Sequence, residues 1–170
     1  LGMLRIYVFQ QDKTAAYDTV NSIQNSSAGT QEKAEAMVLL ARLHESLKEY
    51  KEAIKVLDAC SVTYPLTTMF VPVSMELYRY YKSSNDWPKA FAISERLISR
   101  SPETDIVVEL VNDFNPGQSG MLKAVAESDS RDKYISRLKQ MLDRLQNNRP
   151  DVWKKIQYQA GFIYASILEM

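Results

Sequence analysis

The sequence predicts an all-α protein of about ten helices with no strands. Leu, Ala, Glu, Lys, Gln and Met are common, whereas the 170 residues include only 5 Gly and 6 Pro. This composition favours helix. A two-helix pattern also recurs at a fixed offset of 37 residues, and the C-terminal third contains amphipathic helical periodicity. Together these observations predict a helical array with its own hydrophobic core.

The first predicted hairpin includes "YVFQQDKTAAYDTVNSI". Met3 and Tyr7 lie one turn apart on its first helix, so we expect them to extend one buried stripe. Asp12 precedes the second helix, where an acidic side chain suits the helix dipole. Ala16 lies early in that second helix, and its small side chain allows the two helices to approach closely. The segment "QNSSAGT" then separates this hairpin from the next.

The second predicted hairpin ends with "LHESLKEYKEAIKVLDACSVTYP", residues 43–65. It reads as a helix, a break near residues 47–49, a second helix and a stop at Pro65, because proline cannot continue a helix. The single cysteine, Cys60, falls in an apolar column, and we expect it to be buried and reduced. The only histidine, His44, lies in the column of Tyr7, so we expect a core role for it.

The third predicted hairpin includes "YYKSSNDWPKAFAISERL" and ends at Pro102. Its residues continue the columns of the first two hairpins at the same 37-residue offset. The columns are Met3, Leu40 and Leu77; Leu4, Ala41 and Tyr78; Tyr7, His44 and Tyr81; Asp12, Glu49 and Asp86; Ala16, Ala53 and Ala90; and Ile23, Cys60 and Leu97. So many shared offsets indicate repeats that stack as a solenoid.

Beyond residue 102 the repeat pattern is weaker. "PETDIVVELVNDF" predicts a helix, "NPGQSG" a break, and "MLKAVAESD" a short helix. "RDKYISRLKQMLDRLQ" predicts an amphipathic helix, with Ile135, Leu138, Leu142 and Leu145 on one face. After "NNRPD", "VWKKIQYQAGFIYASILEM" predicts the last helix.

These columns resemble the tetratricopeptide repeat (TPR). The resemblance is clearest at Leu40, Ala41, His44, Tyr50, Ala53, Leu57 and Pro65, and nearly as clear at Leu77, Tyr78, Tyr81, Trp87, Ala90, Leu97 and Pro102. It implies a right-handed superhelical array of antiparallel helix hairpins. Three TPR-like hairpins would occupy residues 1–102, and degenerate helical repeats in residues 103–170 would complete the same solenoid. The first helices of the hairpins would line an inner, concave groove.

The motifs of enzymes are absent from the sequence. "NPGQSG" lacks the lysine and the preceding strand of a phosphate-binding loop. His44 and Cys60 lie on different helices at packing positions, which argues against a catalytic Cys–His pair. Metal-ligand spacing is missing as well, so we expect a non-enzymatic protein with no cofactor and no metal. One cysteine fits a reducing compartment, which slightly favours the cytoplasm, and neither a signal peptide nor a membrane span is predicted.

The candidate binding residues begin with three arginines that share the 37-residue offset, Arg5, Arg42 and Arg79. Each follows the Met3 column by two residues, a rotation of about 200° around the helix. The resemblance implies that this side faces a ligand in the groove. The residues predicted to contact the ligand are Arg5, Val8, Val38, Arg42, Glu45, Met75, Arg79 and Lys82. The alternative is that the arginines form local ion pairs, Arg42 with Glu45 and Arg79 with Glu76.

The function that we expect is an interaction scaffold or adaptor that binds an extended peptide or partner segment, acidic in character, in the concave groove. One alternative is a structural module that self-associates into a homo-oligomer. The other is a helical-repeat nucleic-acid binder, which the equal counts of 21 basic and 21 acidic residues disfavour. Residues 103–130 are acidic and residues 131–157 are basic. These two segments either neutralise each other or provide a basic patch for an acidic partner or for head-to-tail self-association.

Overall fold

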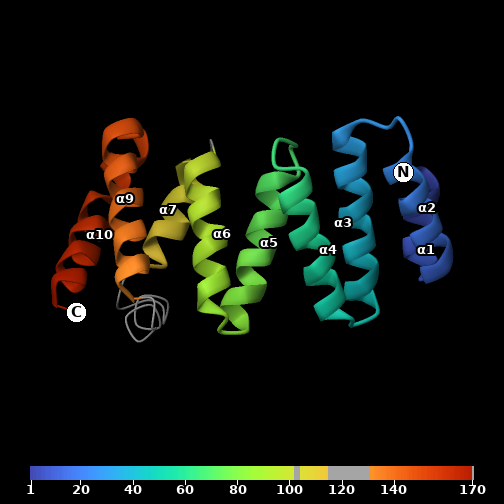
Figure 1. The fold of residues 1–170 in the computed structure, drawn as a ribbon, viewed down its shortest axis with the longest axis horizontal. Coiled ribbons are helices and arrows are strands. Elements are labelled where there is room, and N and C mark those ends of the chain that lie inside the picture. Colours follow the sequence, from blue (N-terminus) through green and yellow to red (C-terminus); the bar gives the residue numbers. More distant parts are fainter. Residues whose placement is uncertain (102–103, 115–130, 170) are drawn as a thin grey trace. The chain divides into compact units, whose positions relative to one another are not determined.

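The structure, a computed structural model, describes residues 1–101, 104–114 and 131–169, and every regular element in these ranges is a helix. The predicted short helix of residues 121–129 lies outside the described residues, and so does Pro102. Figure 1 shows the helices in chain order. Their bounds are α1 (Gly2–Gln10), α2 (Lys13–Asn25), α3 (Thr30–Ser46), α4 (Tyr50–Thr63), α5 (Phe70–Ser83), α6 (Trp87–Arg100), α7 (Thr104–Asn112), α9 (Arg131–Asn148) and α10 (Pro150–Glu169).

The chain forms two compact units, residues 1–80 and residues 81–170. The boundary falls inside α5, so that helix contributes its first part to one unit and its last turn to the other. The predicted domain boundary near residue 102 was drawn from repeat similarity alone and stays a prediction.

The first unit has a core made by α1, α2 and α3, with α4 packed on α3. Small and branched residues fill this core, and partly buried apolar side chains such as Tyr7, Val8 and Tyr17 pack against it. The buried members are Leu4, Ala16, Val20, Ala36, Leu40 and Leu43. Because the alanines remove side-chain bulk, the helix axes can come close together.

The second unit packs α7 against α10, α9 against α10, and α6 against both α7 and α9. Phe91 of α6 lies at its centre. The Phe91 ring meets the rings of Phe114 and Tyr134 edge-to-face, with centroids 5.5 Å and 5.1 Å away. Such aromatic pairs add to the stabilisation from area burial. This cluster fixes α6 relative to α9, the two helices that line the cavity discussed further below.

One turn geometry occurs three times at the predicted offset of 37 residues. Gln11, Lys48 and Asn85 follow α1, α3 and α5, and have left-handed φ angles of 57°, 61° and 59°. In each turn the residue with positive φ donates its N–H three residues back, to Val8, Glu45 and Lys82. The next N–H donates five residues back, to Tyr7, His44 and Tyr81, over 2.7–2.9 Å. These paired bonds form a Schellman motif, so the predicted repeat corresponds to a repeated backbone turn.

Most residues of the predicted packing columns are buried, although Tyr7 and Ile23 are only half-buried. Ala16, Ala53 and Ala90 have no exposed surface, which confirms the alanine column. Another column, Leu4, Ala41 and Tyr78, is at most 1% exposed. The prediction for Met3 is wrong, because its side chain is 56% exposed whereas Leu40 and Leu77 are buried. In α1 it is Leu4 that occupies the core against α2 and α3, and this rotates Met3 toward solvent.

An acidic residue precedes each of α2, α4 and α6, as predicted, but only two of the three cap their helix. The Asp12 carboxylate caps α2 by accepting from the Ala15 N–H at 3.0 Å, and Asp86 accepts from the Lys89 N–H at 3.4 Å. Glu49 forms no such cap. Its carboxylate bonds instead to Lys13 and His44, as described in the next subsection.

Candidate functional site

A surface cavity of about 280 Å³ in the first unit brings together two of the predicted arginines. Its wall on α3 consists of residues spaced three, four and seven apart, which share one face of a helix. Arg5 enters from α1, which packs against α3, and Met69 enters from the segment before α5. The lining residues are Arg5, Glu35, Val38, Leu39, Arg42 and Met69.

Arg5, Arg42 and Arg79 are all exposed. No guanidinium of the three forms a hydrogen bond or an ion pair with a residue in the described ranges. The alternative interpretation required direct ion pairs of Arg42 with Glu45 and of Arg79 with Glu76, and those ion pairs are not formed in this part of the chain. The N–H donors of these three guanidinium groups are therefore not taken up by acceptors in the described residues.

Carboxylates nevertheless lie close enough to the arginines to interact with them electrostatically. Glu76 is partly buried on α5, and burial, followed by a hydrogen bond with Glu45, raises the pKa of Glu76 to about 7. Arg42 and Arg79 both act in the opposite direction on the same pKa, so both guanidinium groups lie within electrostatic reach of Glu76. The Glu45 carboxylate also accepts a short hydrogen bond from the Tyr80 hydroxyl. Arg42 thus shares the cavity with Arg5 and shares Glu76 with Arg79.

The remaining predicted site residues lie in different surroundings. Val38 lines the cavity but is only 5% exposed, and Met75 is 6% exposed, so each offers little surface to a ligand. Val8 packs against the core cluster of the first unit. Lys82 lies in the second unit, where its ammonium group pairs with the Asp113 carboxylate at 2.7 Å.

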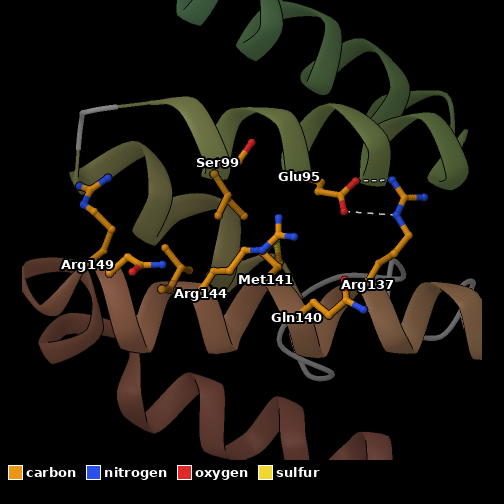
Figure 2. A pocket seen from close by; sticks show the side chains of 10 residues that line it. Glu95, Ser99, Arg137, Gln140, Met141, Arg144 and Arg149 are labelled. Atoms are coloured by element: carbon orange, nitrogen blue, oxygen red, sulfur yellow. Dashed lines mark hydrogen bonds and ion pairs between the residues drawn. The ribbon is translucent and has the colours of Figure 1, made fainter.

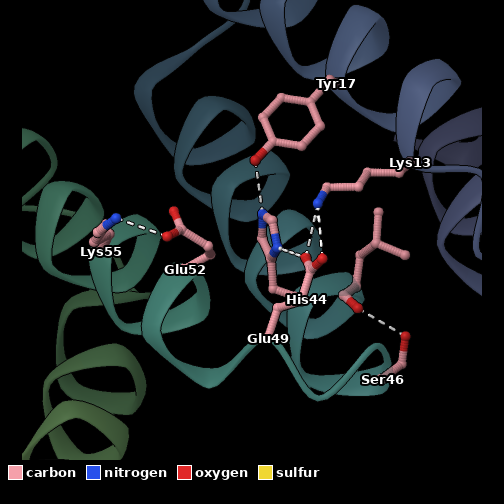
Figure 3. Close-up of polar contacts among 8 residues, drawn as sticks. Lys13, Tyr17, His44, Ser46, Glu49, Glu52 and Lys55 are labelled. Carbon is pink, nitrogen blue, oxygen red and sulfur yellow. Dashed lines mark hydrogen bonds and ion pairs between the residues drawn. The ribbon is translucent and has the colours of Figure 1, made fainter.

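A second polar cluster of the first unit joins α2 to the turn between α3 and α4 (Figure 3). Lys13 contacts both carboxylate oxygens of Glu49 at 2.9 Å, and His44 Nδ1 lies 2.7 Å from Glu49 Oε2. The hydrogen bonds from Lys13 and then from His44 lower the pKa of Glu49. Because an ionised carboxylate only accepts, His44 carries a proton on Nδ1, and its Nε2 is hydrogen-bonded to the Tyr17 hydroxyl at 2.8 Å.

The geometry of this cluster indicates that it stabilises the fold. The His44 side chain is fully buried, which confirms the predicted core position. The sequence pattern did not reveal that both ring nitrogens are satisfied by polar partners, since Tyr17 and Glu49 come from other elements. The network ties three segments of the first unit together through one imidazole.

Cys60 is 2% exposed, as predicted, and burial raises the pKa of its thiol to about 11. Its Sγ lies 3.7 Å from the Ala34 carbonyl oxygen. The thiol therefore has a backbone partner, whereas His44 is bonded to Glu49 and Tyr17. A buried thiol with a raised pKa is a poor nucleophile.

We call the surface around Arg5, Arg42 and Arg79 the arginine face. Sequence reasoning missed three contributors to it, namely Glu35, Met69 and Tyr80. Glu35 was within reach of a pattern, because it lies seven residues before Arg42 on the same helical face. Met69 and Tyr80 had no such signal, since Met69 lines the cavity from the segment before α5 and Tyr80 contacts Glu45 of α3 from the end of α5. The Tyr80–Glu45 hydrogen bond is a contact across 35 residues.

Comparisons of the chain with protein-family models, with curated proteins and with solved structures give no match. Within the described ranges, no group of three or more His, Cys, Asp or Glu side chains is arranged to hold a metal ion. None of the described helices combines the length and the apolar character needed to cross a bilayer.

Proposed function

We propose that the first unit binds an acidic, extended segment of a partner protein along the face that contains Arg5, Arg42 and Arg79. The observation that carries this proposal is the cavity shared by Arg5 and Arg42, whose guanidinium groups have no ion-pair partner in the described residues. An arginine fork binds a carboxylate through two parallel N–H bonds. The protein would then act as an interaction scaffold or adaptor.

The composition of the cavity supports a peptide more than a simple ion. Leu39 and Met69 give it apolar walls, Arg5 and Arg42 supply two positive charges, and Glu35 supplies one negative charge. Acidic residues that alternate with aliphatic ones match this mixture. An extended chain advances roughly 3.3 Å per residue, so acidic groups every few residues can reach successive arginines.

The test uses a fluorescein-labelled six-residue peptide of alternating glutamate and leucine, with a glutamine–leucine peptide as the uncharged comparison. We expect saturable binding of the acidic peptide by fluorescence anisotropy, and Arg42→Gln should weaken it by about three- to tenfold, the value of a partly exposed charged hydrogen bond. Lys51→Gln, an exposed charge change on α4, is the matched control and should leave the affinity unchanged.

The proposal would be contradicted if both peptides bound equally well, or if Arg42→Gln and Lys51→Gln lowered the affinity for the acidic peptide equally. The salt dependence of binding distinguishes the nucleic-acid alternative from peptide binding. A single-stranded oligonucleotide that binds more tightly than the acidic peptide, and loses affinity steeply with added salt, would replace the peptide as the ligand.

Self-association is a second candidate, favoured by exposed apolar side chains on the terminal helices. On α1, Met3, Ile6 and Phe9 are 56%, 48% and 88% exposed, and they lie within about 120° of one another around the helix. On α10, Tyr158, Phe162 and Leu168 are 76%, 64% and 81% exposed. Exposed apolar patches of this kind mark interaction surfaces.

Sedimentation equilibrium tests this candidate over a hundredfold range of protein concentration. A mass that rises with concentration, and that falls back to the monomer in Phe9→Ser or Phe162→Ser, would support self-association. A monomer at all concentrations would exclude it.

A further inference from the structure

The second unit contains another cavity, separate from the arginine face of the first unit. It has a volume of about 140 Å³ and lies between α6 and α9. Residues of α9 spaced three, four, seven and eight apart line one wall, and residues of α6 line the other. The lining residues are Glu95, Ile98, Ser99, Arg137, Gln140, Met141, Arg144, Leu145, Asn148 and Arg149. Figure 2 shows the labelled side chains around this space.

Two of the three arginines in this cavity are held by carboxylates. Arg137 forms a two-pronged contact with Glu95, and its guanidinium also lies 5.2 Å from the centre of the Phe91 ring. Arg149 pairs with Asp151 at 3.0 Å and donates to the Ser101 carbonyl at 3.1 Å. Both guanidinium groups are therefore neutralised and fixed in position.

Arg144 is different. Its side chain is exposed, and it forms no hydrogen bond or ion pair with any residue that the structure describes. Figure 2 shows its guanidinium in the space between α6 and α9, between the two neutralised arginines. Because Glu95 and Asp151 compensate Arg137 and Arg149, Arg144 leaves one uncompensated positive charge in the cavity.

The neighbours of Arg144 suit one ligand chemistry. Gln140 and Asn148 lie one turn before and one turn after it on α9, and each amide can donate without adding charge. The floor of the cavity is apolar, because it is formed by the side chains of Ile98, Met141 and Leu145, which are 3–5% exposed. The cavity has room for roughly five non-hydrogen atoms, at about 30 Å³ each. A carboxylate on two methylene groups has that size and a single negative charge.

We propose that this cavity binds the carboxylate of a glutamate side chain from a partner protein, through a two-pronged contact with Arg144. A phosphate group fits less well, because its second charge would remain uncompensated beside an apolar floor. This site is independent of the arginine face in the first unit.

The test is NMR of the ¹⁵N-labelled protein, with the Arg144 Nε–Hε signal assigned from Arg144→Lys. The probes are N-acetylglutamate methylamide, its glutamine counterpart, glutarate and inorganic phosphate. We expect N-acetylglutamate methylamide to shift the Arg144 Nε–Hε signal and the side-chain amide signals of Gln140 and Asn148 in a saturable way. The glutamine counterpart should cause no saturable shift.

Matched variants then locate the binding. Arg144→Gln should weaken the probe at least tenfold, as read from the Gln140 and Asn148 signals. Lys133→Gln, an exposed charge change elsewhere on α9, and Arg42→Gln in the first unit should leave the affinity unchanged. An unaltered far-ultraviolet circular dichroism spectrum and melt would show that Arg144→Gln folds normally.

Several results would overturn the proposal. Undiminished binding in Arg144→Gln, tighter binding of phosphate than of the glutamate probe, or no saturable shift would each exclude a glutamate site at Arg144. Glutarate that binds more tightly than the glutamate probe would identify the occupant as a small free carboxylate and not a protein side chain.

Discussion

In residues 1–80 the arginines of α1, α3 and α5 are exposed and have no ion-pair partner among the described residues, whereas in residues 81–170 Arg137 and Arg149 are each held by a carboxylate. Arg137 is also stacked near Phe91 and Tyr134, and its side chain is only 31% exposed. The same residue type thus performs two tasks. In the second unit Arg137 joins α6 to α9, and in the first unit Arg5, Arg42 and Arg79 form an open surface.

This difference shows why charge counts alone do not locate a binding surface. The segment of residues 131–157 contains eight basic and three acidic residues, whereas the first unit contains eight basic and nine acidic residues. Two of the arginines in the basic segment are nevertheless neutralised by nearby carboxylates. Lys155 pairs with Asp105 at 2.9 Å, one contact of the predicted kind between the basic and acidic segments. An arginine without a partner is a better indicator of ligand binding than a basic run.

The largest expected effect concerns packing, which the two units share. Ala53 in the first unit and Ala90 in the second have no exposed surface. Replacing either with leucine should overpack a helix contact and lower the free energy of unfolding by roughly 1–3 kcal/mol. Urea denaturation measures both variants. If only one of the two variants lowered the free energy of unfolding, the alanine column would have different roles in the two units.

Part of this fold could be predicted from the sequence, because the alanine and small-residue columns depend on side-chain size at fixed spacing. The repeated left-handed turn was missed, since Gln11, Lys48 and Asn85 are not glycine and share no obvious chemistry. The Met3 prediction failed because the repeat offset does not specify which of two adjacent apolar residues, Met3 or Leu4, enters the core.

The candidate site was predictable only in part. The 37-residue offset identified Arg5, Arg42 and Arg79, and the structure links them through a cavity and through Glu76. Whether an arginine is paired depends on helices that meet in three dimensions. Neither the Arg137–Glu95 pair nor the isolation of Arg144 has a signal in the sequence, because the pairing spans 42 residues.

A smaller effect is expected from removing the carboxylate that holds Arg137. Glu95→Ala should lower the free energy of unfolding by about 1–2 kcal/mol, because a partly buried guanidinium loses a charged partner. Glu52→Ala removes the exposed partner of Lys55 and should lower the free energy of unfolding by less than Glu95→Ala does, because solvent screens an exposed pair. Thermal denaturation of both variants provides the comparison. Equal costs would mean that the Arg137 pair contributes no more than an exposed pair.

The repeated turn predicts a gain in stability. Lys48 and Asn85 both have positive φ, which only glycine adopts without strain. Lys48→Gly should raise the free energy of unfolding by up to about 1 kcal/mol, and Asn85→Gly by less, because asparagine tolerates this conformation better than lysine. Destabilisation by Lys48→Gly in chemical denaturation would show that its side chain contributes more than the backbone strain costs.

The smallest effect concerns pH in the first unit. The pKa of Glu76 is raised from 4.5 to about 7. A carboxyl group with a raised pKa favours the folded state below pH 4.5, and this contribution is lost as the pH rises to about 7. Protonation of Glu76 also leaves Arg42 and Arg79 less compensated, while Glu45 and Tyr80 remain hydrogen-bonded to each other.

We therefore expect the acidic peptide to bind about threefold more tightly at pH 6 than at pH 8, the value of one unit charge across several ångströms of water. Glu76→Gln should remove most of this dependence and bind tightly at both values. Anisotropy titrations at constant ionic strength measure the peptide affinity at both pH values. An unchanged pH dependence in Glu76→Gln would assign the effect to another group.

The most direct test of the contrast between open and paired arginines compares Arg42→Ala with Arg137→Ala. Both variants are made in the Arg144→Gln background, so that the acidic peptide has one predicted binding face. For each variant, peptide affinity is measured by anisotropy and the melting temperature by circular dichroism. We expect Arg42→Ala to weaken binding about three- to tenfold with an unchanged melting temperature, and Arg137→Ala to lower the melting temperature with unchanged binding. If Arg42→Ala lowers the melting temperature and leaves the affinity unchanged, the arginine face is structural and the ligand binds elsewhere.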